Sequence, residues 1–232
     1  MFYFNPQYLL FMVPAILVML AAQLYVNSTY KKWGKIPIRT RLTGEQATRS
    51  LISTGGLYDV EIQQVQGQLT DHYDPRKKVL SLSPTVYQGN SIASVAIAAH
   101  ELGHALQDKE GYFPLRLRSL LVPVVTIGST LGWILILVGL LINAIGLAWL
   151  GVFAFSGGAV FALATLPVEL NASARAKQLL KGSGVISSPD EERGVNSVLN
   201  AAALTYVASL FTAVMQLFYW ISIVSGGRGR RR

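Results

Sequence analysis

The chain has 232 residues, of which 51% are hydrophobic and 14% are charged, and its mean hydropathy is +0.40. It contains no cysteine, which excludes disulfide bonds and thiolate metal ligands, so any zinc must be held by histidine and carboxylate side chains. The formal net charge is +8, but the basic C-terminal run is short and has no interleaved aromatic residues. This pattern argues against nucleic-acid binding and favours attraction to anionic lipid.

Membrane spans are predicted where the chain lacks Asp, Glu, Lys and Arg. Three such stretches occur, and each exceeds the roughly 20 apolar residues that cross a bilayer: they are residues 1–30, 119–168 and 194–227. The first has no basic segment before it and no small-residue cleavage site after it, so it predicts an uncleaved anchor rather than a signal peptide.

The charge-free stretches, with the segments between them, predict the organisation of the whole chain. The second stretch is too long for one helix and is expected to turn at Asn143-Ala144-Ile145-Gly146. The expected segments are a transmembrane helix (1–26), a soluble module (27–118), a transmembrane hairpin (119–166), a helical segment (167–200), a fourth transmembrane helix (201–224) and a basic tail (225–232).

The soluble module shows signals for helices and strands. Thr43 and Gln46 form a capping-box pattern for a short helix that ends near Gly55-Gly56. Residues 60–65 alternate as a strand does, and residues 79–83 predict a second strand joined to the first through the turn at Asp74-Pro75. A small sheet that leads into a helix offers an edge strand along which an extended peptide can bind.

The most informative pattern is His100-Glu101-Leu102-Gly103-His104. On a helix, His100 and His104 project from one face about one turn apart, where both imidazoles can bind one zinc ion. Glu101 then lies beside the metal and can take a proton from an activated water. The chain has only three histidines, and two of them stand in this pattern. A solvated polar patch is the alternative, but the Ala-rich run before His100 predicts burial, where unpaired imidazoles are costly.

A catalytic zinc needs a third protein ligand and a position for water. No histidine follows His104, so the ligand is expected to be a carboxylate. Glu169 is the best candidate, because the membrane hairpin would return it to the side of the two histidines. The alternative is that Glu169 lies in the first turn of a new helix that starts after Pro167, where any acid is electrostatically favourable.

Four segments together resemble the YugP-like neutral zinc metallopeptidases of bacterial membranes: residues 70–79, 98–107, 167–176 and 198–207. The resemblance runs nearly end to end and implies an integral-membrane gluzincin with endopeptidase activity. The chain also resembles, more distantly, membrane proteases related to the prenyl-protein protease, which carry Glu-x-x-Ala-Asp. Glu169 and Ala172 match that pattern, but Ser173 replaces the aspartate. The family's aspartate orients a zinc-ligating histidine, so Ser173 is expected to do so more weakly and Asn171 to share the role.

The predicted protein is therefore a mainly α membrane protein with four transmembrane helices and a small α+β zincin-like catalytic module. The expected function is zinc-dependent endopeptidase activity on polypeptides, including membrane or membrane-associated proteins. One Zn²⁺ per chain is expected, held by His100, His104 and Glu169, with Glu101 as the catalytic base. The alternatives are a catalytically inactive zinc-binding scaffold and an intramembrane-cleaving metalloprotease.

Lysine and arginine flanks predict the orientation in the cell membrane. They follow the first span, precede the second and follow the third, so all three clusters lie on one side, which the positive-inside rule makes the cytoplasm. The catalytic module is accordingly expected to be cytoplasmic. The tail arginines oppose this orientation, because four spans place both termini on the other side, and long loops follow the rule poorly. The oligomeric state is not predicted.

Overall fold

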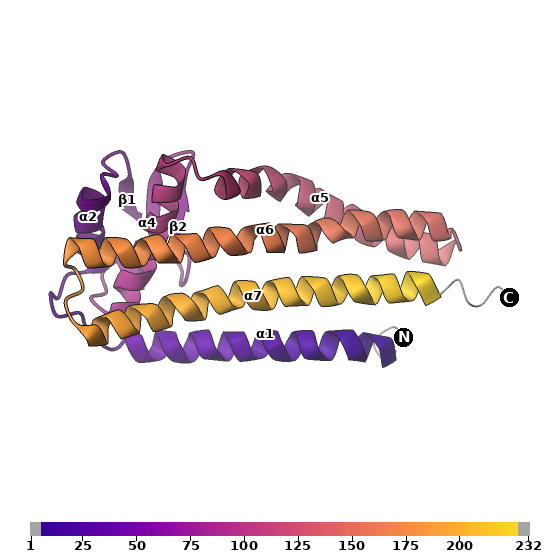
Figure 1. Cartoon of the computed structure of the whole chain (residues 1–232), viewed down its shortest axis with the longest axis horizontal. Coiled ribbons are helices and arrows are strands. Elements are labelled where there is room, and N and C mark those ends of the chain that lie inside the picture. Colours follow the sequence, from indigo (N-terminus) through magenta and orange to yellow (C-terminus); the bar gives the residue numbers. More distant parts are fainter. Residues whose placement is uncertain (1–5, 227–232) are drawn as a thin grey trace. The chain divides into compact units, whose positions relative to one another are not determined.

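The computed structural model describes residues 6–226, so the first five residues of the predicted anchor and residues 227–232 of the predicted tail lie outside it. The described chain contains seven helices and three strands (Figure 1). It divides into two compact units. Within the described residues, the first comprises residues 6–22, 116–167 and 205–226, and the second comprises residues 23–115 and 168–204.

The first unit is built from parts of four long helices. They are α1 (Pro6–Trp33), α5 (Phe113–Leu141), α6 (Ile145–Ser183) and α7 (Pro189–Gly226). Each is long and apolar enough to cross a membrane. The predicted four transmembrane helices are thereby confirmed. At about 1.5 Å per residue, the 39 residues of α6 reach about 58 Å, far more than the roughly 30 Å of bilayer hydrocarbon.

The helical hairpin turns where the sequence predicts, between Leu141 and Ile145, and Asn143 takes a positive φ of 57° in the turn. Within this unit α5 and α6 approach closely at glycines. A Cβ on Gly132 would lie 2.6 Å from the backbone nitrogen of Phe155, and one on Gly139 would lie 2.5 Å from that of Ala148. Small residues of this kind let transmembrane helices pack backbone to backbone.

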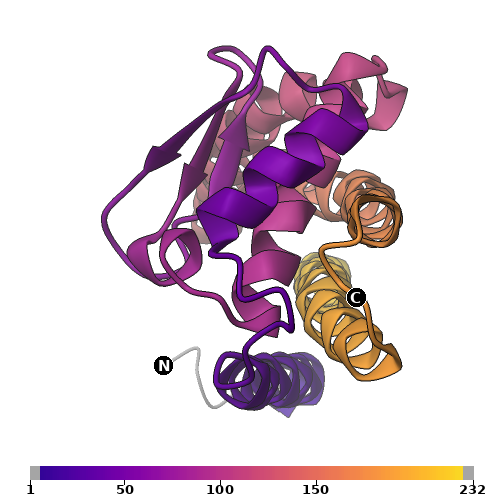
Figure 2. The same ribbon diagram turned by 90° about the vertical axis from the view of Figure 1, so that its left-hand side faces the viewer.

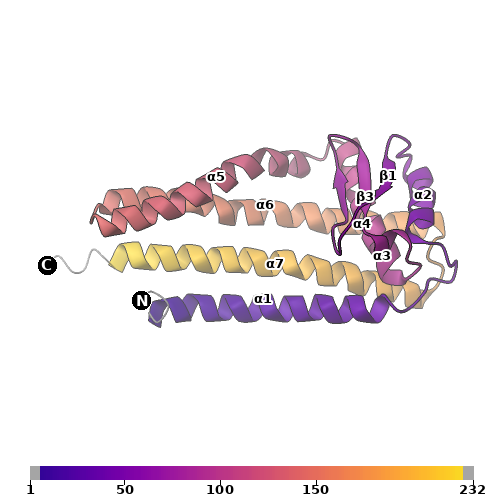
Figure 3. The ribbon, with the colours of Figure 1, turned by 180° about the vertical axis from the view of Figure 1, so that it is seen from behind.

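The second unit combines helical and strand elements. Its short elements are α2 (Gly44–Gly55), β1 (Glu61–Gln64), β2 (His72–Asp74), β3 (Val79–Leu82), α3 (Pro84–Tyr87) and α4 (Ile92–Lys109). Figure 2 shows α2 beside α4 and the small sheet, and Figure 3 shows β1 and β3 next to α3 and α4. Buried side chains of α2, β3, α4, α6 and α7, including Leu51, Leu80, Leu102, Leu180 and Leu199, form one core.

The predicted capping box of α2 is confirmed. The Thr43 hydroxyl accepts from the backbone N–H of Gln46, the Gln46 side chain accepts from the N–H of Thr43, and Gly56 ends the helix with φ 62°.

The predicted strand connection is wrong. The two predicted strands, β1 and β3, pair in parallel, with Glu61 opposite Val79, so they cannot form the two arms of a hairpin. The hairpin is made instead by β2 and β3, which pair antiparallel across the Asp74-Pro75 turn. The sheet order is β1-β3-β2. Because β2 has only three residues, it is too short to show an alternating pattern.

Candidate metal centre

Helix α4 carries the histidine pair as the spacing predicts. The Ser91 hydroxyl accepts from the backbone N–H of Ser94 at 3.1 Å and caps the helix start, and the Ala-rich turns that follow are buried. His100 and His104 lie on one face, with ring centroids 5.0 Å apart, and each side chain is 12% exposed. The helix therefore presents two imidazoles, side by side, at the edge of the core.

Glu169 joins the histidines from α6. Its Oε2 lies 3.2 Å from His100 Nε2 and 3.4 Å from His104 Nε2, and the residue is only 1% exposed. One ligand atom from each of the three residues lies within 4.8 Å of the others. Atoms that share a tetrahedral zinc, at bond lengths of about 2.1 Å, lie about 3.4 Å apart. The nitrogen–oxygen distances and the donor chemistry both fit that ion.

The predicted helix start at Pro167 is wrong, and the correction bears on Glu169. Helix α6 continues through Pro167, so Glu169 lies in the helix interior rather than in a first turn. The helix dipole therefore does not account for a buried carboxylate here. What stabilises the charge of Glu169 is its position between two imidazoles.

Close packing of α4 and α6 brings these residues together. Gly103 stands between the two histidines in the sequence, and a Cβ there would lie 2.3 Å from the backbone oxygen of Ala172. No other residue type allows α6 to come this near. Ala172 is itself fully buried, and it lies three residues after Glu169.

The ionisable groups of the centre shift one another's pKa values. Burial opposes ionisation of Glu169, but hydrogen bonds with His100 and His104 outweigh it and hold its pKa below the usual range. Burial also disfavours the charged form of His104, yet the hydrogen bond to Glu169 and the charge of Glu101 raise its pKa. Burial raises the pKa of Glu101, against the attraction of both histidines. A raised pKa suits a group that must both accept and release a proton.

Each imidazole has a second polar partner. His100 Nδ1 lies 3.2 Å from the hydroxyl of Ser173, the position at which the related pattern has aspartate. His104 Nδ1 lies 3.0 Å from Oε1 of Gln107, which in turn contacts Asn171. Asn171, which is expected from the sequence to help orient a histidine, therefore reaches His104 only through Gln107. Sequence reasoning missed Gln107, which is fully buried one turn after His104, because its partners Val168 and Asn171 are more than 60 residues away in the sequence.

Other polar residues have structural partners. His72 is exposed on β2, with Nδ1 2.8 Å from the carbonyl oxygen of Thr70. Glu191, a further carboxylate, accepts hydrogen bonds from the backbone N–H groups of Arg39 and Ser188 and caps the start of α7. These contacts explain both residues without a metal.

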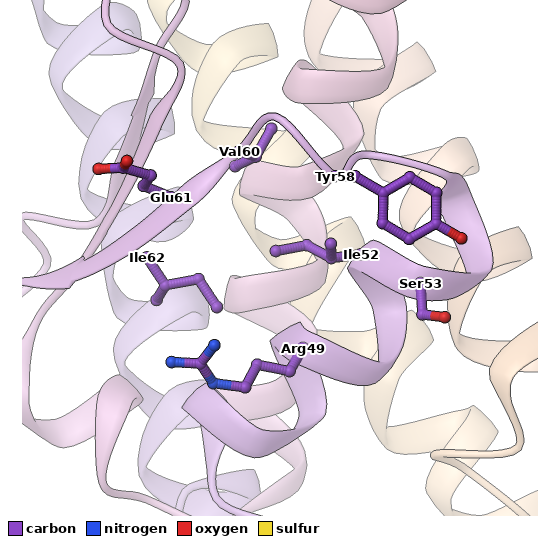
Figure 4. A pocket seen from close by; sticks show the side chains of 7 residues that line it. All are labelled: Arg49, Ile52, Ser53, Tyr58, Val60, Glu61 and Ile62. Carbon is purple, nitrogen blue, oxygen red and sulfur yellow. The ribbon is translucent and has the colours of Figure 1, made fainter.

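The second unit also contains a groove of about 490 Å³ along α2 and β1, formed by Arg49, Ile52, Ser53, Tyr58, Val60, Glu61 and Ile62 (Figure 4). Its lining has one acid and no histidine, so it lacks a zinc ligand set. Among the described residues, His100, His104 and Glu169 form the group that could hold a metal ion.

The comparisons with known proteins identify the class. Residues 8–225 match the family model described as "Putative neutral zinc metallopeptidase", and the chain belongs to this family. It is a membrane protein whose cofactor is zinc.

A relative in Bacillus subtilis (strain 168), described as "Putative membrane protease YugP", is 44% identical over 207 residues. The match covers 89% of this chain and 92% of the relative. No solved structure matches the chain significantly. The resemblance seen in the sequence is confirmed at the level of the family.

Proposed function

We propose that this chain is a zinc endopeptidase of the gluzincin type, in which His100, His104 and Glu169 hold one zinc ion and Glu101 is the catalytic base. The observation that supports it best is the convergence of the three candidate ligand atoms at zinc-like spacings, although Glu169 on α6 stands 65 residues after His104 on α4. Two imidazoles and one carboxylate are also a donor set that catalytic zinc sites use, with a fourth position left for water.

Bound zinc would lower the pKa of a water molecule to about 7 and polarise the substrate carbonyl. Glu101 is placed next to His100 on α4, where its charge interacts with both histidines and with Glu169. Its carboxylate accepts the proton of the attacking water and then delivers that proton to the nitrogen of the leaving amine.

The substrate is a polypeptide, bound in extended form along a sheet edge. Strand β2 is the edge strand that contacts α4, because the Tyr73 hydroxyl donates to Asp108 of α4 at 3.0 Å. Main-chain pairing to such an edge gives affinity with little sequence preference. Membrane or membrane-associated proteins are the expected substrates, since the enzyme itself is held in the bilayer.

Two observations bear on the rival functions. The histidine pair lies on α4, which is not among the four helices apolar enough to span a membrane in the described residues, and this disfavours an intramembrane-cleaving enzyme. Glu101 is not needed to hold a metal, so a zinc-binding scaffold would not require it.

Metal content and peptidase activity of the detergent-purified protein test the proposal. We expect zinc in the protein as purified, cleavage of casein, loss of cleavage on chelation, and recovery when zinc is added back. Bound zinc without cleavage of casein or of membrane-protein substrates would favour the scaffold. Cleavage that persists after complete removal of the metal would reject the mechanism.

A further inference from the structure

Gln107 is a buried amide whose three hydrogen bonds reach both sides of the metal centre. The residue lies on α4, one turn after His104, and is 0% exposed. Its Nε2 donates to the carbonyl oxygen of Val168 at 2.8 Å and to Oδ1 of Asn171 at 2.9 Å, while its Oε1 lies 3.0 Å from His104 Nδ1. Because a buried amide is costly unless it is paired, these contacts define its orientation.

Arg175, which contacts Asn171, determines which groups in these hydrogen bonds donate and which accept. The Arg175 guanidinium only donates, and its Nε lies 2.7 Å from Asn171, so the atom that Asn171 presents must be the acceptor Oδ1. That oxygen can only accept from Gln107 as well. The backbone carbonyl of Val168 imposes the same requirement independently. Both partners therefore turn Nε2 of Gln107 towards α6 and leave Oε1 facing His104.

Oε1 has no proton to give, so the hydrogen bond with His104 forms when Nδ1 carries the proton. The lone pair of the neutral ring then lies on Nε2, the atom that is 3.4 Å from Glu169 Oε2. The same amide also holds the carbonyl of Val168, the residue before Glu169. One side chain thus contacts the expected ligand His104 and the backbone next to the expected ligand Glu169.

We propose that Gln107 is a positioning residue that selects the metal-binding tautomer of His104 and ties the backbone beside Glu169 to α4. This inference rests on the proposed ligand set of His100, His104 and Glu169. Gln107 does not touch the reacting atoms, and it acts only through the ligands.

The first test compares zinc affinity in matched variants. Gln107→Met keeps the length of the side chain but removes all three hydrogen bonds, and we expect a zinc dissociation constant about 10–100 times larger. Thr48→Val is the control, because it removes the hydrogen bond from a fully buried hydroxyl to the Gly44 carbonyl on α2. It should leave zinc affinity unchanged. Equal zinc affinity in Gln107→Met and the wild type would overturn the proposal.

The second test needs no variant and so does not depend on the folding of Gln107→Met. Nitrogen-15 NMR of the zinc-loaded wild-type protein should find the His104 proton on Nδ1. A proton on Nε2 would overturn the proposal. The ligand set is tested separately: if His104→Ala or Glu169→Ala keeps full zinc, the proposed function fails, whereas loss of zinc there and not in Gln107→Met rejects this inference alone.

Discussion

In the absence of metal, Glu169 and the histidines stabilise one another, and this makes zinc binding depend on pH. The pKa of His104 is raised above its ordinary value of 6.5, so its contribution to stability is present below pH 6.5 and is lost as the pH rises through the raised value. The pKa of Glu169 is lowered from 4.5, so its contribution is present above pH 4.5 and is lost as the pH falls through the lowered value. Both contributions coexist in mildly acidic solution.

Zinc requires neutral imidazoles and therefore competes with the proton on His104. We expect the zinc-dependent rise in the thermal unfolding midpoint to be larger at about pH 8 than at about pH 6, because fewer protons compete with zinc for the imidazoles at the higher pH. Differential scanning fluorimetry in detergent, with and without chelator, measures this difference. A larger rise at the lower pH would contradict it.

Residue spacing was enough to predict the histidine pair, because the relation between residues four apart is local to one helix. The sequence could predict that the hairpin brings the Glu169 carboxylate back to the side of the histidines. It could not predict the distance from that carboxylate to either imidazole. Gln107 could not be assigned, since its partners Val168 and Asn171 depend on how two helices far apart in sequence come into register.

At the scale of elements, the candidate site depends on helices α4 and α6, which carry the two histidines and Glu169. The three candidate ligands meet only because Gly103 has no Cβ where α4 passes the backbone of Ala172. The sequence predicts both helices from their apolar patterns. It does not predict that α6 runs unbroken past Pro167, because a proline ordinarily ends or kinks a helix.

Substitution of Gly103 tests the role of this close approach. A methyl group at Gly103 would meet the backbone of Ala172, which cannot move aside as a flexible side chain could. Gly103→Ala should therefore destabilise the protein by about 1–3 kcal/mol and weaken zinc binding. Gly182→Ala is the matched control on α6, since its Cβ would lie 3.6 Å from a Thr54 methyl group, an ordinary contact. Unfolding curves and zinc titrations of both variants give the answer. Normal zinc affinity in a folded Gly103→Ala would show that the approach is not required.

For the whole molecule, the three charge-free stretches predict the four transmembrane helices well, because bilayer length and apolar composition are properties of a single helix. The sheet of the second unit was predicted less well, since the parallel pairing of β1 with β3 is a long-range contact and β2 is very short. The basic flanks predict that the second unit lies on the cytoplasmic side of the membrane.

Thiol labelling of intact cells tests that orientation cleanly, because the chain has no cysteine of its own. Lys77→Cys places a thiol on an exposed turn of the second unit, and Ile142→Cys places one in the exposed turn between α5 and α6. A membrane-impermeant maleimide should label Ile142→Cys and spare Lys77→Cys until the cells are opened. The reverse pattern would put the catalytic module outside, and each variant serves as the control for the other.

The central claim assigns different tasks to two carboxylates, Glu101 and Glu169, and a paired measurement of zinc content and peptidase activity separates them. The folded, detergent-purified wild type should hold one zinc per chain and cleave peptide. Glu101→Gln should hold the same zinc and lose activity by about 100-fold or more, because only the base is removed. Glu169→Ala should lose both zinc and activity, because two neutral imidazoles remain. A full equivalent of zinc in Glu169→Ala, or cleavage at the wild-type rate by Glu101→Gln, would contradict the account.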